Sequence, residues 1–177
     1  MVTPSQPPNQ ILAATVEHST LVAVVGMANF KLAQAFRQAI QAARLAGSRL
    51  VVVDMAACQG MDSTFMGTLA AMGLAADKPD GTPAVLINLS EHGANLLRGL
   101  GVDRILKFYP AQFLPESIRD MAPLVASLQP IEAPPQASHE MAAMMFDAHE
   151  TLTRVEPENL QRFKDVLEYL RKDIAQL

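Results

Sequence analysis

The spacing of apolar residues changes several times along the 177-residue chain, and each change predicts an element of secondary structure. Residues 11–16 and 21–25 are two short β-rich runs separated by four residues, a spacing that suits an antiparallel hairpin. From Asn29 to Ala46 apolar residues recur every three or four positions, which predicts an amphipathic helix that stops at Gly47. The chain therefore begins with two strands and a helix.

The next part of the chain alternates between strand and helix patterns. Residues 50–53 are four consecutive apolar residues, which is typical of a strand covered on both faces. Further elements are expected as follows: a helix from about Ser63 to Ala76, a turn at 79–81, a strand at 84–87, a short helix capped by Ser90, and a strand at 104–109. The predicted order is β-β-α-β-α-β-α-β, and the strands at 50–53 and 84–87 should be parallel because a helix connects them.

The composition changes after Tyr109. Six of the 12 prolines follow before residue 136, so residues 110–136 are expected to form a Pro-rich linker. Two helical patterns come next, one from Ser138 to about Thr153 with a methionine-rich stripe typical of core filling, and one opened by Pro157. The predicted parts are a loose tail at 1–10, a domain at 11–109, the linker, and a helical hairpin at 137–177.

The hairpin is expected to dock on a surface, because its apolar stripe is too short for a stable coiled coil alone. Its own domain, a second copy of the chain and a separate partner all provide such a surface. Two roles follow from the first two: covering an exposed edge of the sheet, and forming a homodimer through the C-terminal helices.

Composition and charge exclude several classes of function. The net charge is −4 and no segment is basic, so the chain lacks the electrostatic footprint of a nucleic-acid-binding protein. No apolar run approaches the ~20 residues of a membrane span, and the first residues lack the positive cluster of a signal peptide, so a cytoplasmic protein is expected. The single cysteine, Cys58, excludes an internal disulfide and is expected to be a small buried side chain.

The strongest candidate for a functional site is Asp62-Ser63-Thr64, which follows the strand at 50–53. Asp62 is a good N-cap and places both hydroxyls in the first turn of a helix, where backbone N–H groups have no partner within the helix. A phosphate on such a hydroxyl lies next to free donors and the positive end of the helix dipole. The same residue types are also the commonest at helix starts, where they only satisfy backbone amides.

Three segments together resemble the STAS domain, a family named for sulphate transporters and anti-sigma factor antagonists. The segments are residues 51–54 with 61–67 (VVVD and MDSTFMG), residues 88–91 (NLSE) followed by Leu96-Leu97, and residues 100–105 (LGVDRI). The resemblance covers about residues 11–109. It implies an α/β fold, a STAS-like mixed β-sheet with helices packed on it, to which this chain adds the C-terminal helical hairpin.

The resemblance implies a bacterial, non-enzymatic protein-binding module of signal transduction and transcription regulation. In antagonists of this family, a kinase-type anti-sigma factor phosphorylates the serine that corresponds to Ser63, with Thr64 as the neighbouring hydroxyl. The unphosphorylated form binds this serine kinase, and a phosphatase resets the switch. The kinase brings ATP and magnesium, so no cofactor is expected here. The residues expected to bind the partner are Asp62, Ser63, Thr64, Phe65 and Met66, supported by Asp54 and Gly67.

One position departs from the family pattern. Phe65 stands where a glycine is common, which predicts a bulky side chain beside the switch. Three histidines, His18, His139 and His149, are scattered without the spacing of metal ligands and are expected to be solvated.

Three other interpretations compete with the switch. A constitutive STAS-like scaffold in a transport or stress-signalling complex would use binding without phosphorylation. A serine hydrolase would use Asp54, Ser63 and His92 as a triad, although the chain has no Gly-x-Ser-x-Gly elbow at this serine. A metal site formed by Asp54 and Asp62 has no third ligand in view.

Overall fold

The two β-rich runs at the start of the chain form the predicted antiparallel hairpin. In the computed structural model, which describes residues 8–176, β1 (Gln10–Val16) pairs with β2 (Ser19–Ala28) along its whole length. Val16 faces Ser19, so the turn between them is only two residues long. Residues 1–7 of the predicted tail lie outside the described residues.

The first helix begins and ends at residues that the sequence marks. In α1 (Phe30–Leu45), the side chain of Asn29 accepts hydrogen bonds from the amides of Lys31 and Leu32. Gly47, with φ +74°, takes the left-handed conformation in which glycine commonly ends a helix. The predicted amphipathic helix is therefore confirmed, and its apolar face packs on the sheet.

Parallel strands continue the sheet from β2. They are β3 (Leu50–Asp54), β5 (Ala84–Ile87) and β6 (Lys107–Tyr109), connected by α2 (Ser63–Ala76) and α3 (Glu91–Gly99). The order across the sheet is β6-β5-β3-β2-β1-β7. The parallel pairing of the strands predicted at 50–53 and 84–87 is thus confirmed.

The last of these strands is shorter than predicted. Residues 102–104 form a 3₁₀ turn, η1 (Val102–Arg104), and only Lys107–Tyr109 extends. Leu106 lies between this turn and β6, and its side chain is buried in the core. An apolar run that fills the core from a turn has the same sequence pattern as a strand, which is why the prediction of a strand at 104–109 was too long.

A strand that the sequence did not predict lies between β3 and α2. β4 (Cys58–Met61) pairs in parallel with the end of β2, beyond the residues of β2 that pair with β3. The pair has an irregular register between Gly26 and Met27. The sequence Cys-Gln-Gly-Met of β4 contains no β-branched or aromatic residue, so composition gave no sign of it.

The predicted Pro-rich linker is largely folded. Residues 111–130 form η2 (Ala111–Phe113), α4 (Glu116–Arg119), α5 (Ala122–Val125) and β7 (Gln129–Pro130), which pairs antiparallel with β1. Ile118, Met121 and Leu124 are buried against the sheet. Residues 131–137 are the longest stretch between β6 and α6 that forms no helix or strand, so the continuous linker is shorter than the predicted 110–136.

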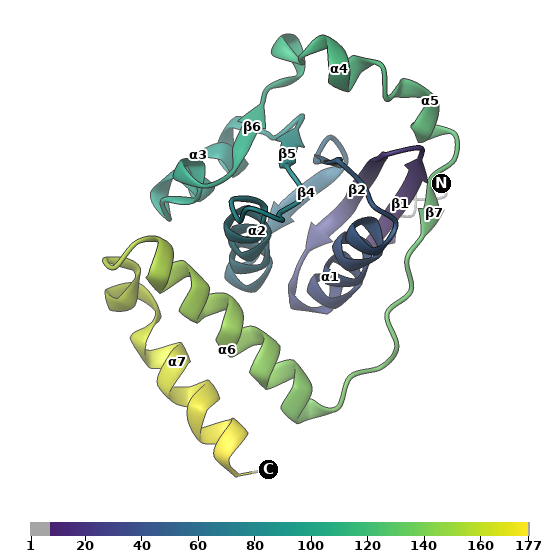
Figure 1. The fold of residues 1–177 in the computed structure, drawn as a ribbon. Coiled ribbons are helices and arrows are strands. Elements are labelled where there is room, and N and C mark those ends of the chain that lie inside the picture. Colours follow the sequence, from purple (N-terminus) through teal and green to yellow (C-terminus); the bar gives the residue numbers. More distant parts are fainter. Residues whose placement is uncertain (1–7, 177) are drawn as a thin grey trace, which may run out of the picture.

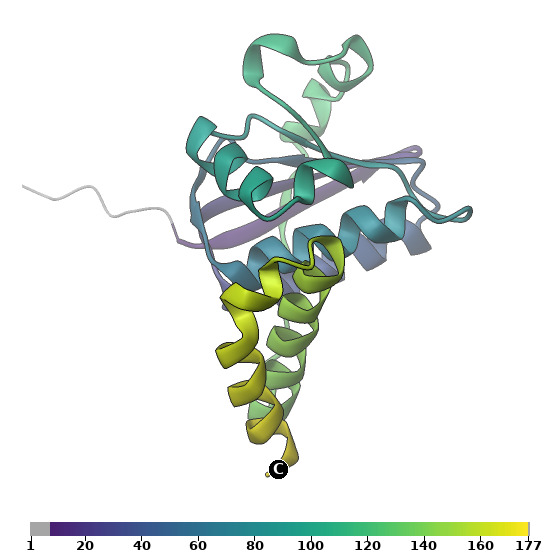
Figure 2. The same ribbon diagram turned by 90° about the vertical axis from the view of Figure 1, so that its left-hand side faces the viewer.

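The sheet is covered on both faces (Figures 1 and 2). Along β3, Val51 and Val53 belong to the core beneath α1 and α2, whereas Val52 belongs to the smaller cluster beneath α4 and α5. All three are buried, which confirms the prediction of a strand covered on both faces.

The C-terminal hairpin forms an additional layer. α6 (Ser138–Val155) and α7 (Asn159–Ala175) pack on each other, and α6 packs on the outer side of α2. Figure 2 shows the hairpin beyond α1 and α2, projecting away from the sheet. The prediction that it covers a sheet edge is wrong, because it covers a helix instead. Part of the methionine stripe is core, with Met144 buried.

Candidate functional site

The predicted N-cap Asp62 lies where two helices begin. β4 runs beside the end of β2, so the amide of Asp62 donates to the carbonyl of Ala28 at 3.0 Å. One carboxylate oxygen of Asp62 accepts from the amide of Phe65 at 2.8 Å, and the other accepts from the amide of Phe30 at 2.7 Å. Asp62 therefore caps both α1 and α2, and its negative charge lies between two positive helix ends.

The hydroxyl of Ser63 has a partner that the sequence did not predict. Its Oγ lies 2.9 Å from Nε2 of His149, which is 86 positions away on α6. His149 is only 2% exposed, so the prediction that it is solvated is wrong. His18 and His139 are exposed, as predicted.

The hydrogen bonds of His149 define which ring nitrogen carries the proton. Nδ1 lies 2.7 Å from the carbonyl oxygen of Met145, and a carbonyl only accepts, so Nδ1 donates. In the neutral ring Nε2 then accepts the proton of the Ser63 hydroxyl. The ring also contacts Phe163 of α7 edge-on, with centroids 5.1 Å apart, so both helices of the hairpin hold it in place.

The residues that follow Ser63 point into the protein. Thr64 is 2% exposed, and Phe65 is fully buried in the core with its ring centroid 5.1 Å from that of Phe36. Met66 is also buried. The bulky side chain predicted beside the switch at Phe65 thus belongs to the core, and a role of Phe65 and Met66 in partner binding stays a prediction.

Gly67 allows the hairpin to approach α2 closely. A β-carbon added at this position would lie 2.6 Å from the carbonyl carbon of Ala148 and 2.9 Å from its Cα. Real β-carbons essentially never come this close to backbone atoms, so only glycine permits this contact. Gly67 therefore supports the site by allowing the backbone of α6 to come close at Ala148, the residue before His149.

Asp54 organises the loop after β3. Its Oδ1 accepts from the amide of Ala56 at 2.9 Å and from the side-chain nitrogen of Asn88 at 2.8 Å. His92 is exposed in the first turn of α3, and the serine of the proposed triad bonds His149 instead. The hydrolase arrangement of Asp54, Ser63 and His92 is thus not assembled.

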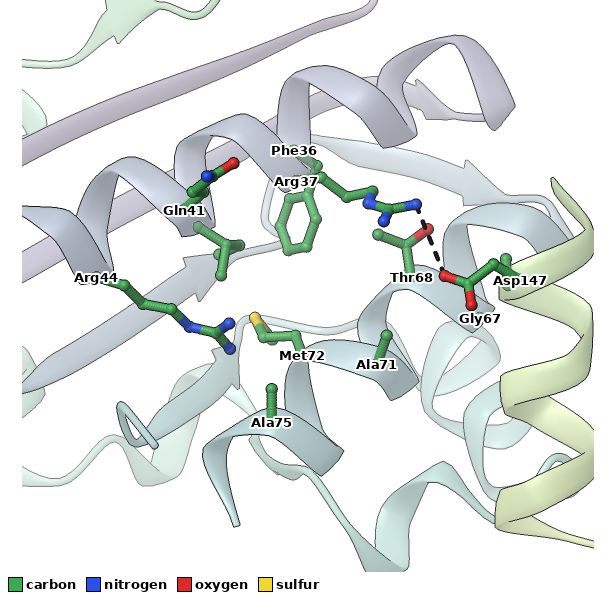
Figure 3. A pocket seen from close by; sticks show the side chains of 12 residues that line it. Phe36, Arg37, Gln41, Arg44, Gly67, Thr68, Ala71, Met72, Ala75 and Asp147 are labelled. Carbon is green, nitrogen blue, oxygen red and sulfur yellow. Dashed lines mark ion pairs between the residues drawn. The ribbon is translucent and has the colours of Figure 1, made fainter. Parts of the chain in front are cut away.

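A groove runs beside the site between α1, α2 and α6 (Figure 3). Its volume is about 360 Å³, with Phe36 and Met72 among the residues that line it. Arg37 of α1 forms an ion pair across the groove with Asp147 of α6 at 3.8 Å, and both side chains are half exposed. Such an exposed pair contributes little to stability, so α6 is held mainly by α2 and α7.

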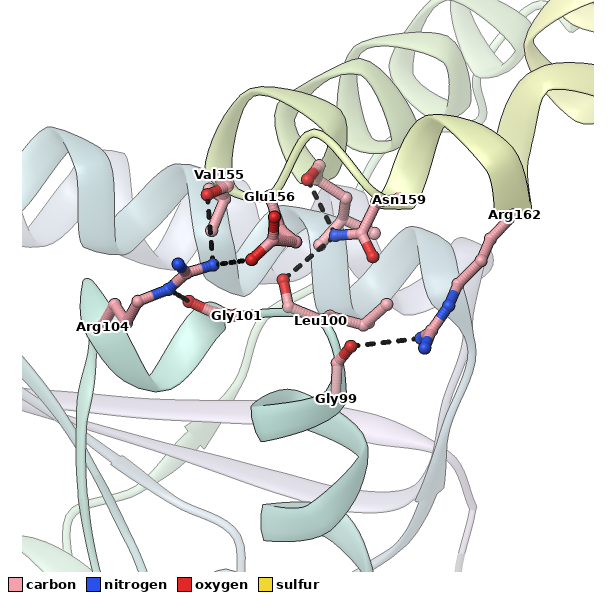
Figure 4. Close-up of polar contacts among 9 residues, drawn as sticks. Gly99, Leu100, Gly101, Arg104, Val155, Glu156, Asn159 and Arg162 are labelled. Carbon is pink, nitrogen blue, oxygen red and sulfur yellow. Dashed lines mark hydrogen bonds and ion pairs between the residues drawn. The ribbon is translucent and has the colours of Figure 1, made fainter.

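The elbow of the hairpin, where α6 ends and α7 begins, is attached to the domain by polar contacts (Figure 4). The buried side-chain nitrogen of Asn159 donates to the carbonyls of Leu100 and Leu152, at 3.0 and 2.9 Å. Arg104 forms an ion pair with Glu156, and Arg162 donates to the carbonyl of Gly99 at 3.1 Å. We call these contacts the elbow latch.

Cys58 lies in β4, partly exposed. Its thiol donates to the carbonyl of Gly60 at 3.4 Å. Burial raises the pKa of the Cys58 thiol above its ordinary value, although hydrogen bonds with the backbone of Gly60 and Ala28 offset part of the effect. The thiol is therefore protonated and weakly nucleophilic at neutral pH.

The sequence of α2 contains a signal for the contact with the hairpin. The 14 residues of α2 include no charged side chain, and residues 64–70 are all buried. A helix that is apolar on every side is covered on every side, so the face of α2 away from the sheet required a second layer. Nothing in the pattern indicated that His149 would meet Ser63.

Residues 8–176 contain neither a cluster of metal-binding side chains nor a helix suited to a membrane. No group of three or more His, Cys, Asp or Glu side chains in this part of the chain is arranged to hold a metal ion. Among the same residues, no helix combines the length and the apolar character that crossing a membrane demands.

Comparisons with known proteins detect similarity of structure but not of sequence. No protein-family model matches the chain, and no curated protein matches it. The crystal structure of an anti-sigma factor antagonist from Mycobacterium paratuberculosis is similar, with 20% identity and a TM-score of 0.52 over 68% of this chain and 97% of that chain. The overall structure of SLC26A9 is similar with 16% identity and a TM-score of 0.50 over 80% of this chain, but only 27% of that chain.

At these identities the likeness concerns the fold. The mixed sheet and its helices match the STAS-like α/β fold that the sequence motifs predicted, and that prediction is confirmed. About a third of the present chain has no counterpart in the bacterial antagonist, whose own chain is almost entirely covered.

Proposed function

We propose that this protein is a non-enzymatic, protein-binding regulator whose binding is switched by phosphorylation of Ser63. The partner would be a serine kinase of the anti-sigma factor type, and a phosphatase would reset the switch. The observation that carries the proposal is Asp62-Ser63 at the meeting point of two helix starts, in a fold similar to that of an anti-sigma factor antagonist.

The local electrostatics favour a phosphate at this position. Phosphorylation adds a charge of about −1.5 to −2 and three acceptor oxygens, next to the first-turn amides of α2 and the start of α1. Favourable interaction with a helix end is worth about 0.3–1 kcal/mol at an exposed position. The modified protein therefore keeps its fold, while a partner that contacts Ser63 meets a new charge beside Asp62.

The burial pattern favours Ser63 over Thr64 as the acceptor. Ser63 is partly exposed at the first position of α2, whereas Thr64 is buried. A kinase reaches the Ser63 hydroxyl once the imidazole of His149 moves aside, but reaching Thr64 also requires the first turn of α2 to unwind.

A constitutive scaffold is the second candidate. It is favoured by the hydrogen bond between Ser63 and His149, because a hydroxyl engaged with a buried side chain is explained by its structural role alone. In this case the protein would bind its partner regardless of phosphorylation.

Phosphopeptide mass spectrometry on the native protein, isolated with phosphatase inhibitors during growth and under stress, separates the two candidates. A phosphate on Ser63 whose occupancy changes between conditions is expected for the switch. Zero occupancy in all conditions, with the peptide well covered, would leave the scaffold. As a second test, Ser63→Asp should abolish capture of a partner that Ser63→Ala retains, whereas a scaffold would bind equally well with either variant.

A further inference from the structure

The outer face of α2, which points away from the sheet, is covered by α6 of the C-terminal hairpin. From the structure we infer that this face is a docking site for one α-helix, that α6 occupies it within the chain, and that a helix of a partner protein binds there by displacing α6. The inference rests on the proposed function, since it concerns how the Ser63 site becomes available to a partner.

The geometry defines the kind of helix that fits. At the crossing with Gly67 the approaching backbone leaves no room for even a β-carbon on α2, and α6 presents the small residue Ala148 there. At the next position α6 presents a ring nitrogen that accepts a hydrogen bond from Ser63. A partner helix would therefore carry Ala or Gly opposite Gly67, followed by a hydrogen-bond acceptor that reaches Ser63.

Another helix can take the place of α6, although the outer face of α2 must always be covered. α2 has no charged residue, so its outer face needs an apolar cover in any state. However, α6 reaches α1 across an open groove with an exposed ion pair, and residues 131–137 join it to the domain without forming a helix or strand. The hairpin can leave as a unit without breaking any strand pairing of the sheet.

The elbow latch determines how easily α6 leaves. The buried side chain of Asn159 donates both to the carbonyl of Leu152 within the hairpin and to the carbonyl of Leu100 in the domain. Removing this side chain therefore weakens the attachment of the hairpin to the domain. The remaining latch contacts, Arg104 with Glu156 and Arg162 with Gly99, lie closer to solvent. Asn159→Ala should therefore raise the fraction of molecules in which α6 is detached from α2, while leaving the surface of α2 unchanged.

The test uses the full chain and a fluorescent synthetic peptide of residues 137–176 as the probe. In the wild type the attached hairpin competes at an effective concentration in the millimolar range, so the peptide should bind weakly. Asn159→Ala should bind it about tenfold more tightly or better. Adding Gly67→Ala should remove this binding, because the new β-carbon would collide with the incoming helix.

Gly73→Ala in the Asn159→Ala background is the matched control. It is the same change in the same helix, but its β-carbon would meet the backbone of Ile105 rather than the hairpin. Peptide binding should therefore persist. If Asn159→Ala binds no more tightly than the wild type, or if Gly67→Ala has no effect, the inference is overturned.

Two measurements keep the inference testable if a variant folds poorly. In native-state hydrogen exchange on the wild type, amides of α6 and α7 should exchange together and faster than those of β3; equal protection would mean a fixed hairpin and overturn the inference. Light scattering should show that Asn159→Ala is a monomer. A dimer that exchanges hairpins would mean that α6 of a second copy, and not a partner protein, binds the outer face of α2, and would overturn the inference. These assays contain no kinase. A negative result in them therefore concerns only the docking of a helix on α2, whereas an absence of phosphate on Ser63 concerns the proposed switch.

Discussion

Ser63 and His149 form the contact on which the site depends. Each lies on a different layer, and their hydrogen bond at 2.9 Å is oriented by a second bond from His149 to the backbone of its own helix. A serine that would otherwise only begin a helix is thereby linked to the position of the C-terminal hairpin.

The energy of this contact is measurable with a double-mutant cycle. Ser63→Ala leaves the buried Nε2 of His149 without a partner, which should lower the free energy of unfolding by about 1–3 kcal/mol. His149→Ala removes the other partner, and the coupling between the two changes should be about 0.5–1.5 kcal/mol. Urea unfolding of the four proteins measures it, and strictly additive effects would contradict the hydrogen bond.

Cys58 provides a second test at the scale of one residue. Because burial raises the pKa of the Cys58 thiol, alkylation by iodoacetamide at pH 8 should be slower in the native protein than in urea. A raised pKa stabilises the fold fully below the ordinary value of 9.0, and this stabilisation is lost as the pH rises through that value and the native one. Loss of stability above pH 9.0 should accordingly be smaller in Cys58→Ala, and an equal loss in both proteins would contradict the raised pKa.

At the scale of elements, β4 has the largest consequence for the site. By pairing with the end of β2, this short strand delivers Asp62 to the start of α1 as well as to the start of α2. One carboxylate thereby joins the starts of two helices that lie in different parts of the chain.

Removing that carboxylate should weaken both helix starts. Asp62→Ala frees the amides of Phe30 and Phe65 and should cost about 1–3 kcal/mol of unfolding free energy, more than a typical single cap. Asp62→Asn keeps one accepting oxygen and should cost less. Thermal and urea unfolding give both values, and equal costs would show that only one of the two bonds contributes.

At the scale of the whole molecule, the protein consists of a STAS-like domain and a hairpin that covers the uncharged helix α2. Because α2 needs cover, its exposure should favour association of the chain with other apolar surfaces. The same feature that gives the molecule its additional layer also makes the α2 face suitable for binding.

Truncation after Pro135 tests this dependence. Without the hairpin the outer face of α2 is open, so the truncated chain should have a lower thermal midpoint, bind a hydrophobic dye and associate in light scattering. A truncated chain that stays monomeric with an unchanged midpoint would show that the hairpin does not protect α2. Gly67→Ala in the full chain should shift the same observables in the same direction but to a smaller extent.

Much of the fold followed from the sequence because its elements are encoded locally. Asn29 and Gly47 bound α1, Asp62 begins α2, and the apolar run at 51–53 forms the doubly covered strand, since caps and periodicity act within a few residues. β4 was missed because its pairing with β2, rather than its own composition, makes it a strand. The folding of residues 111–130 was underestimated because proline content obscured apolar residues that pack on the sheet.

The sequence by itself determined the element order, the STAS-like motifs and the hydroxyl at the start of α2, because each of these depends on neighbours along the chain. Only the tertiary structure decided that His149 meets Ser63, that Phe65 is core, and that the hairpin covers α2 rather than a sheet edge. These outcomes depend on which surfaces fit together across distant segments, and at Gly67 the fit depends on the absence of a single β-carbon.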